Sequence, residues 1–149
     1  MSEKKKLSAK KYLEQLEIID MMINQDLERL DDMKTDACSA GGIDYSKDRV
    51  QTSMSGDSIG NVVVRYMTLN DEINAEIDSF VNAKNQIIQE IRGLKDKNYI
   101  NVLYKVYVQY KSVRQASKEM KMSYSYVIEL HNRALDMFEN TYSNLHYLT

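Results

Sequence analysis

Residues 112–138 read SVRQASKEMKMSYSYVIELHNRALDMF, and they contain two helical patterns separated by a short polar break. Ser112 followed by Gln115 forms an S-x-x-Q capping box, which is typical of the first residues of a helix. Ser123 stands where its hydroxyl can cap a second helix. The stretch therefore predicts two helices joined by a turn of three to four residues, which is a helix-turn-helix.

The same pattern sets the expected boundaries. We predict a helix from Asn98 to Gln109, a middle helix from Val113 to Glu119, and a final helix from Tyr124 to about Tyr142, with a frayed tail after it. The side chains predicted to be buried between the last two helices are spaced to meet one another: Val113, Ala116, Met120, Met122, Val127, Leu130, Ala134, Leu135 and Phe138.

This packing leaves one face of the final helix directed outward. In a DNA-binding helix-turn-helix the second helix lies in the major groove, and its N-terminal residues contact base edges. The candidates for base contacts are Tyr124, Ser125, Ile128 and Glu129, which offer hydroxyls, a methyl contact for thymine and an acceptor for the cytosine amino group. The candidates for phosphate contacts are Lys111, Arg114, Lys118, Lys121, Ser123 and Arg133. From spacing alone, a three-helix packing unit with ordinary surface charge is the alternative.

Two long amphipathic helices are predicted before this segment. The first runs from about Leu7 to Ala37, with an apolar seam of Ala9, Tyr12, Leu16, Ile19, Ile23, Leu30, Met33 and Ala37 that Asp26 interrupts. The second starts near Asp57 or Ser58 and carries Ile59, Val62, Tyr66, Leu69, Ile73, Ile77, Phe80, Ala83, Ile87, Ile91 and Leu94. Such seams must be buried, either in an antiparallel hairpin within the chain or in a coiled coil with a second chain.

We predict a loop at about 38–56, because this stretch collects Ser, Gly, Asp and Thr. The expected domains are residues 1–94, a helical hairpin for dimerisation or partner binding, and residues 95–149, a DNA-binding domain. The first has 12 basic and 17 acidic residues, and the second has eight basic and five acidic residues. Contact with phosphates is therefore expected in the second domain.

Composition excludes several other classes of protein. The 149 residues include no proline and only five glycines, which argues against turn-rich β folds and for an all-α fold. One cysteine and two histidines supply too few ligands for a thiolate–imidazole zinc site, so we expect no metal and no cofactor. We interpret His131 as a partly exposed helix residue. With no phosphate-binding glycine loop, nucleophile turn or membrane-spanning run, we expect a cytoplasmic protein that is not an enzyme.

The stretch from about Leu94 to Phe138 resembles region 4 of sigma-70-type factors. The resemblance rests on LKDKNYINVLYKVYV, on SVRQASKEMKMS followed by SYVIELHNRAL, and on the spacing Val127-x-x-Leu130-x-x-x-Ala134-Leu135. It implies that Tyr124, Ser125, Ile128 and Glu129 lie where that family reads the promoter −35 element. The family usually has basic or polar residues in place of Tyr124 and Ile128, so the resemblance does not imply the usual −35 sequence.

The chain has a long helical N-terminal part, a Ser/Gly/Asp-rich middle that contains VQTS (residues 50–53), and a C-terminal part similar to sigma region 4. In this combination it resembles, over nearly its whole length, small phage-encoded transcriptional regulators of the ArpU/RinA type. This resemblance implies a DNA-binding regulator of phage late or packaging genes in a bacterial host, with a promoter as its double-stranded DNA partner. We expect the long helices either to set the spacing of two subunits or to hold a protein partner, for which RNA polymerase is the candidate. A homodimer would present two recognition helices to the DNA. The alternatives are a helical protein-interaction adaptor or anti-activator, and a packaging component similar to a small terminase subunit.

Overall fold

The computed structural model describes residues 6–43 and 56–148, with side chains described for residues 6–36 and 63–148. Every regular element in these ranges is helical, which confirms the predicted all-α class. Within the described part of the chain, none of the helices combines the length and hydrophobicity needed to span a lipid bilayer. The chain divides into two compact units, Met1–Met21 with Phe80–Thr149, and Met22–Ser79.

Two long helices each contribute to both units. Helix α1 spans Ala9–Ile43 and helix α3 spans Gly56–Arg92. Helix α1 thus continues past Ala37, where the sequence predicted a loop from residue 38. Without a proline to stop it, the Cys38–Ile43 segment can remain helical at only a modest propensity cost for its two glycines. The remainder of the predicted loop, residues 44–55, lies outside the described residues.

In the unit formed by Met1–Met21 and Phe80–Thr149, the start of α1 runs antiparallel to the end of α3. The Tyr12 hydroxyl donates to the Glu90 carboxylate at 2.5 Å, and Lys84 Nζ lies 2.7 Å from Asp20 Oδ1. The apolar seams are buried in this unit, with the following side chains: Ala9, Tyr12, Leu13, Leu16 and Ile19 from α1, and Phe80, Ala83, Ile87 and Ile91 from α3.

In the Met22–Ser79 unit the seams are less completely buried. Ile73 is buried, whereas Ile23, Leu30, Met33 and Ile77 are half-buried and Leu69 is exposed. Asp26 is buried at the seam position where it interrupts the apolar pattern, and its Oδ1 accepts a 3.1 Å hydrogen bond from Arg29. Arg29 also lies 3.9 Å from Glu76 of α3.

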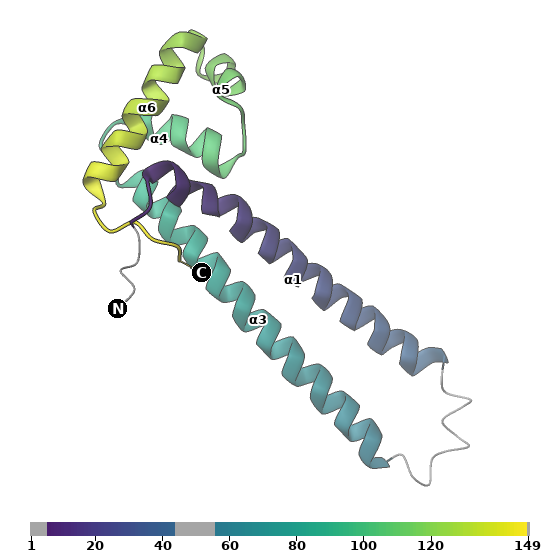
Figure 1. Ribbon diagram of the computed structural model, residues 1–149. Coiled ribbons are helices and arrows are strands. Elements are labelled where there is room, and N and C mark those ends of the chain that lie inside the picture. Colours follow the sequence, from purple (N-terminus) through teal and green to yellow (C-terminus); the bar gives the residue numbers. More distant parts are fainter. Residues whose placement is uncertain (1–5, 44–55, 149) are drawn as a thin grey trace. The chain divides into compact units, whose positions relative to one another are not determined.

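Three shorter helices follow α3 and pack on one another (Figure 1). They are α4 (Lys97–Leu103), α5 (Val113–Met120) and α6 (Tyr124–Thr141), and α6 packs against both α4 and α5. The predicted single helix from Asn98 to Gln109 is instead α4 followed by a wider π-helical turn, η1 (Tyr104–Val108). Asp96, which the sequence analysis did not select, caps α4 by accepting hydrogen bonds from the Asn98 and Tyr99 amides.

The turn after η1 is anchored to α1. Tyr110 has a φ of 58°, in the left-handed region that non-glycine residues rarely adopt. Its hydroxyl donates to the Leu16 carbonyl at 3.1 Å and to the Asp20 carboxylate. Burial, together with the hydrogen bond to Asp20 and the charge of that carboxylate, raises the pKa of Tyr110. These bonds hold the backbone in a conformation that local propensity disfavours.

The C-terminal tail is packed rather than frayed, contrary to the prediction. Leu145 is buried, and its carbonyl accepts a 2.9 Å hydrogen bond from the Leu7 amide. The Leu148 amide donates to Gln15 Oε1 at 2.9 Å. The start of α1, the end of α3, the three short helices and the tail thus belong to one compact unit.

Candidate nucleic-acid interface

Helices α5 and α6 begin at the two predicted serine caps. Ser112 Oγ accepts the Gln115 amide at 3.1 Å, and Ser123 Oγ accepts the Tyr126 amide at 3.2 Å, so both caps are confirmed. Between the helices, Lys121 adopts a left-handed conformation with a φ of 56°. The Met122 amide then bonds to the Ser117 carbonyl at 3.0 Å, which closes the end of α5.

One side of α6 is buried as predicted. Val127, Leu130, Ala134 and Phe138 recur at helical spacing and are buried, and Ala116 of α5 is fully buried. The neighbouring Ser117 is also buried, and its hydroxyl donates to the Arg114 carbonyl at 2.6 Å. The other members of the predicted buried set are half-buried: Val113, Met120, Met122 and Leu135.

The opposite side of the first turns of α6 is open. The four candidates for base contacts, Tyr124, Ser125, Ile128 and Glu129, are all exposed. Tyr126 is also 45% exposed, although the sequence analysis did not select it. A rotation of about 100° per residue puts Tyr126 on the other flank of the buried stripe, which a helical projection would have indicated. The start of α6 therefore presents hydroxyls, rings, a methyl-bearing side chain and a carboxylate.

The candidates for phosphate contacts differ in the contacts that their side chains already make within the protein. Lys118 and Lys121 are exposed, and the Arg114 guanidinium lies over the Tyr124 ring, 4.7 Å from its centroid. Ser123 is exposed but its hydroxyl already accepts the cap hydrogen bond.

Lys111 and Arg133 are already paired with carboxylates. Lys111 Nζ lies 2.5 Å from Glu119 Oε1, and Lys105 lies 3.2 Å from the same oxygen. The hydrogen bond from Lys111 lowers the pKa of Glu119. Arg133 lies 2.5 Å from Glu129, one helical turn away. These two cations would have to leave or share a carboxylate in order to contact a phosphate.

His131 is half-buried and connects α6 to η1, a link that the sequence analysis did not detect. Its Nε2 lies 2.9 Å from the Tyr107 hydroxyl, and the two rings are stacked with centroids 5.6 Å apart. Burial lowers the pKa of His131. Burial likewise raises the pKa of Tyr107 to about 12, with a contribution from the negative charge of Glu14. The pair therefore joins α6 to η1. The four exposed candidates for base contacts on α6 take no part in it.

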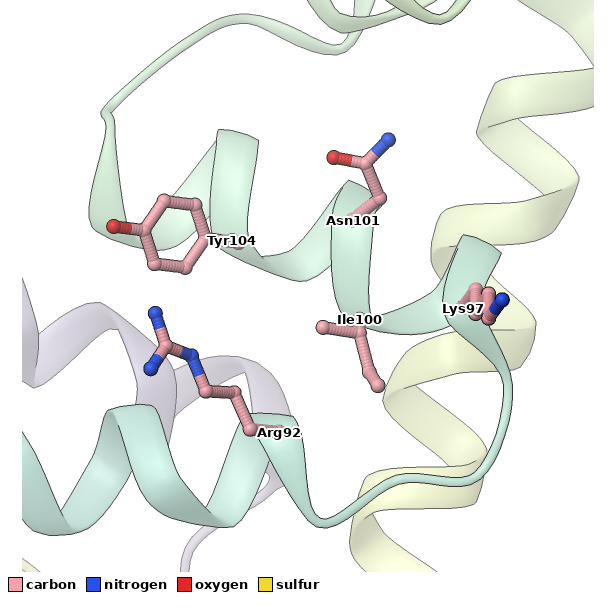
Figure 2. Close-up of a pocket in the computed structure, with 5 residues that line it drawn as sticks. All are labelled: Arg92, Lys97, Ile100, Asn101 and Tyr104. Carbon is pink, nitrogen blue, oxygen red and sulfur yellow. The ribbon is translucent and has the colours of Figure 1, made fainter.

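A pocket of about 260 Å³ lies beside α4 (Figure 2). It is lined by Arg92, Lys97, Ile100, Asn101 and Tyr104, and the Arg92 guanidinium lies 6.0 Å from the centroid of the Tyr104 ring. None of these residues was a candidate from the sequence. The volume is at the low end for small-molecule pockets, so it does not by itself indicate a ligand.

One comparison with known proteins identifies a family. The family model described as "Protein of unknown function (DUF1492)" matches residues 39–139, which is more than half of the chain, so the chain belongs to this family. No curated protein matches the chain significantly, and no solved structure does. The matched range includes α5, the turn and α6 as far as residue 139.

Proposed function

We propose that this member of the DUF1492 family is a sequence-specific double-stranded DNA-binding protein that regulates transcription. In this proposal α5, the turn and α6 act as a helix-turn-helix similar to sigma-70 region 4, and α6 enters the major groove. The observation that carries the proposal is the exposure of Tyr124, Ser125, Ile128 and Glu129 on a helix whose other side is buried. The exposed Lys118 and Lys121 supply positive charge beside that surface for phosphates.

The resemblance to ArpU/RinA-type regulators narrows the proposal. The protein acts at promoters of phage late or packaging genes, in the cytoplasm of the bacterial host, with RNA polymerase as its protein partner. In this proposal it modulates initiation by another factor and does not initiate transcription alone. In this role it needs no cofactor and catalyses no reaction.

The long helices give the second part of the proposal, a helical hairpin or coiled coil that joins two copies of the chain. The antiparallel pairing of Tyr12 with Glu90 and of Asp20 with Lys84 supports a hairpin within the chain. A dimer would present its two α6 helices to half-sites about 34 Å apart, or a multiple of that spacing.

A mobility-shift assay on the promoter region upstream of the neighbouring phage genes tests DNA binding. We expect a shift whose affinity falls steeply between about 50 and 200 mM salt. Replacement of Tyr124, Ser125, Ile128 and Glu129 by alanine should abolish the preference for the promoter over random DNA. Lys118→Ala should reduce the slope of log affinity against log salt by about one, whereas Lys34→Ala, an exposed lysine of α1, should leave it unchanged. Promoter preference retained by the quadruple variant would exclude this interface.

A second candidate function, a protein-interaction adaptor, is favoured by a different observation. Val63, Val64 and Met67 of α3 are 50–61% exposed. Exposed apolar side chains that cluster on one helix are typical of protein-binding surfaces. Heparin chromatography separates the two functions: retention that decreases with salt supports DNA binding, and flow-through at low salt supports the adaptor.

A further inference from the structure

The Arg114 side chain is held against the first residue of α6. Its guanidinium carbon lies 4.7 Å from the centroid of the Tyr124 ring, within the range of a cation–π contact. Arg114 is the second residue of α5 and Tyr124 is the first residue of α6, so the contact crosses the turn. Both residues are exposed. The pair therefore lies on the surface that the proposed function assigns to the major groove.

Arg114 differs from the other arginine of this surface. Arg133 forms a salt bridge with Glu129 at 2.5 Å. The nearby cation Lys111 likewise forms a salt bridge with Glu119 at 2.5 Å. Among the described residues, no carboxylate forms a salt bridge with Arg114. Its N–H donors are thus available to a ligand, while the Tyr124 ring limits the positions that the guanidinium plane can take.

An ordered guanidinium matches one base edge in particular. Guanine presents the acceptors O6 and N7 side by side in the major groove, and arginine binds them with two parallel hydrogen bonds. The aromatic stack lowers the conformational entropy lost when that geometry forms, because the guanidinium fork is already oriented. A lysine at the same position would keep the charge but not the paired donors.

Resting on the proposed DNA-binding function, we propose that Arg114 and Tyr124 form one reading unit for a guanine in each half-site. Arg114 donates to guanine O6 and N7, and Tyr124 acts as a positioning residue that orients the guanidinium. The sequence analysis assigned Arg114 to phosphate contacts, and the two roles predict different results on substitution. The affinity of a phosphate contact depends on the charge of the side chain and not on the DNA sequence. The affinity of a guanine contact depends on the two parallel N–H donors of the guanidinium and on the base at one position.

The test is selection of bound sequences from a randomised DNA library, followed by measured affinities on the selected site. We expect the wild type to enrich a site with one strongly preferred guanine. Arg114→Lys should lose that preference and weaken binding to the site on the order of 10- to 100-fold, with the salt slope unchanged. Tyr124→Phe, which keeps the ring, should retain the guanine preference, and Tyr124→Ala should reduce it.

A modified base provides a readout that a structural role would not change. Replacement of the preferred guanine by 7-deazaguanine removes the N7 acceptor and should weaken the wild type but leave Arg114→Lys unaffected. Lys118→Ala serves as the matched control, since it should weaken all sequences equally. Circular dichroism melting of each variant verifies that it folds, which is expected because both side chains are exposed.

Two results would overturn the inference in distinguishable ways. If the wild type enriches a site but Arg114→Lys keeps the same base preferences, Arg114 is a phosphate contact and only this inference fails. If the wild type enriches no sequence and binds no duplex, the proposed function fails together with it.

Discussion

Tyr107 and His131 form a stacked, hydrogen-bonded pair that joins η1 to α6. Their ring planes are 18° apart, and the Tyr107 hydroxyl lies 2.9 Å from His131 Nε2. Because the imidazole is half-buried, its neutral form is favoured and its pKa is lowered in the folded protein. The position of α6 against its neighbours thus depends partly on a group whose protonated form is disfavoured by burial.

This pair predicts a loss of stability on acidification. An unfolded chain protonates His131 with an ordinary pKa of about 6.5, whereas the folded protein does so only at lower pH. Stability should therefore fall as the pH drops below about 6.5, and it should level off below the folded pKa. His131→Phe, which keeps a ring for stacking, should show a smaller change in urea midpoint between pH 7.5 and 5.5 than the wild type. His146→Gln is the control, because His146 is exposed and its Nδ1 lies 2.9 Å from the nearby Asn144 carbonyl oxygen. Parallel pH profiles for wild type and His131→Phe would contradict the prediction.

Gly93 lies directly under the Tyr142 hydroxyl. A Cβ at position 93 would lie only 2.4 Å from that oxygen, which donates a 2.7 Å hydrogen bond to the Glu90 carbonyl. Gly93→Ala should therefore displace the hydroxyl and destabilise the protein by about 1–3 kcal/mol in denaturant unfolding. In a double-mutant cycle, adding Gly93→Ala to Tyr142→Phe should cost much less, because the clashing atom is gone. Additive effects of the two substitutions would show that the hydroxyl is not the obstacle.

Asp26 interrupts the apolar seam of α1 at a cost in stability. The residue is 3% exposed, and its Oδ2 has no hydrogen-bond partner among the described residues. Asp26→Leu should stabilise the protein by about 1–4 kcal/mol, since burial of a poorly paired carboxylate is unfavourable. Its salt-bridge partner Arg29 is half-exposed and can return to water. The exposed Asp31→Leu is the matched control and should change stability little. A lower thermal midpoint for Asp26→Leu would show that the carboxylate has partners that stabilise it.

Phe138 is the largest buried side chain of α6. It is fully buried, and its ring centroid lies 5.7 Å from that of Tyr12 and 4.9 Å from that of Tyr142. Phe138→Ala should cost about 3–5 kcal/mol, because it removes a large apolar side chain and leaves a cavity. The adjacent Met137→Ala, at a position that is 42% exposed, should change stability by less than about 1 kcal/mol. Thermal unfolding followed by circular dichroism would measure the stability of both variants. Equal losses of stability would show that Phe138 is no more important to the core than the exposed Met137.

Much of the helical architecture could be predicted from local patterns. The Ser112 and Ser123 caps and the buried stripe of α6 follow from side chains within a few residues of one another, so their spacing alone indicates them. The exposure of the four candidates for base contacts follows from the same periodicity. The wrong predictions lie at the end of α1, at the π-helical turn η1 and in the C-terminal tail. At the end of α1, weak local preferences did not stop the helix, and at the tail a distant partner decided the structure.

The sequence by itself determined the all-α class and which side of the last helix is buried, because helical periodicity depends only on residues within a few positions of one another. Only the tertiary structure decided which charges are free. It placed Glu119 between Lys105 and Lys111 and the Arg114 guanidinium on the Tyr124 ring. It also docked Leu145 beside Leu7. These contacts join residues that lie far apart in sequence or on opposite sides of a turn, and their formation depends on how whole helices pack.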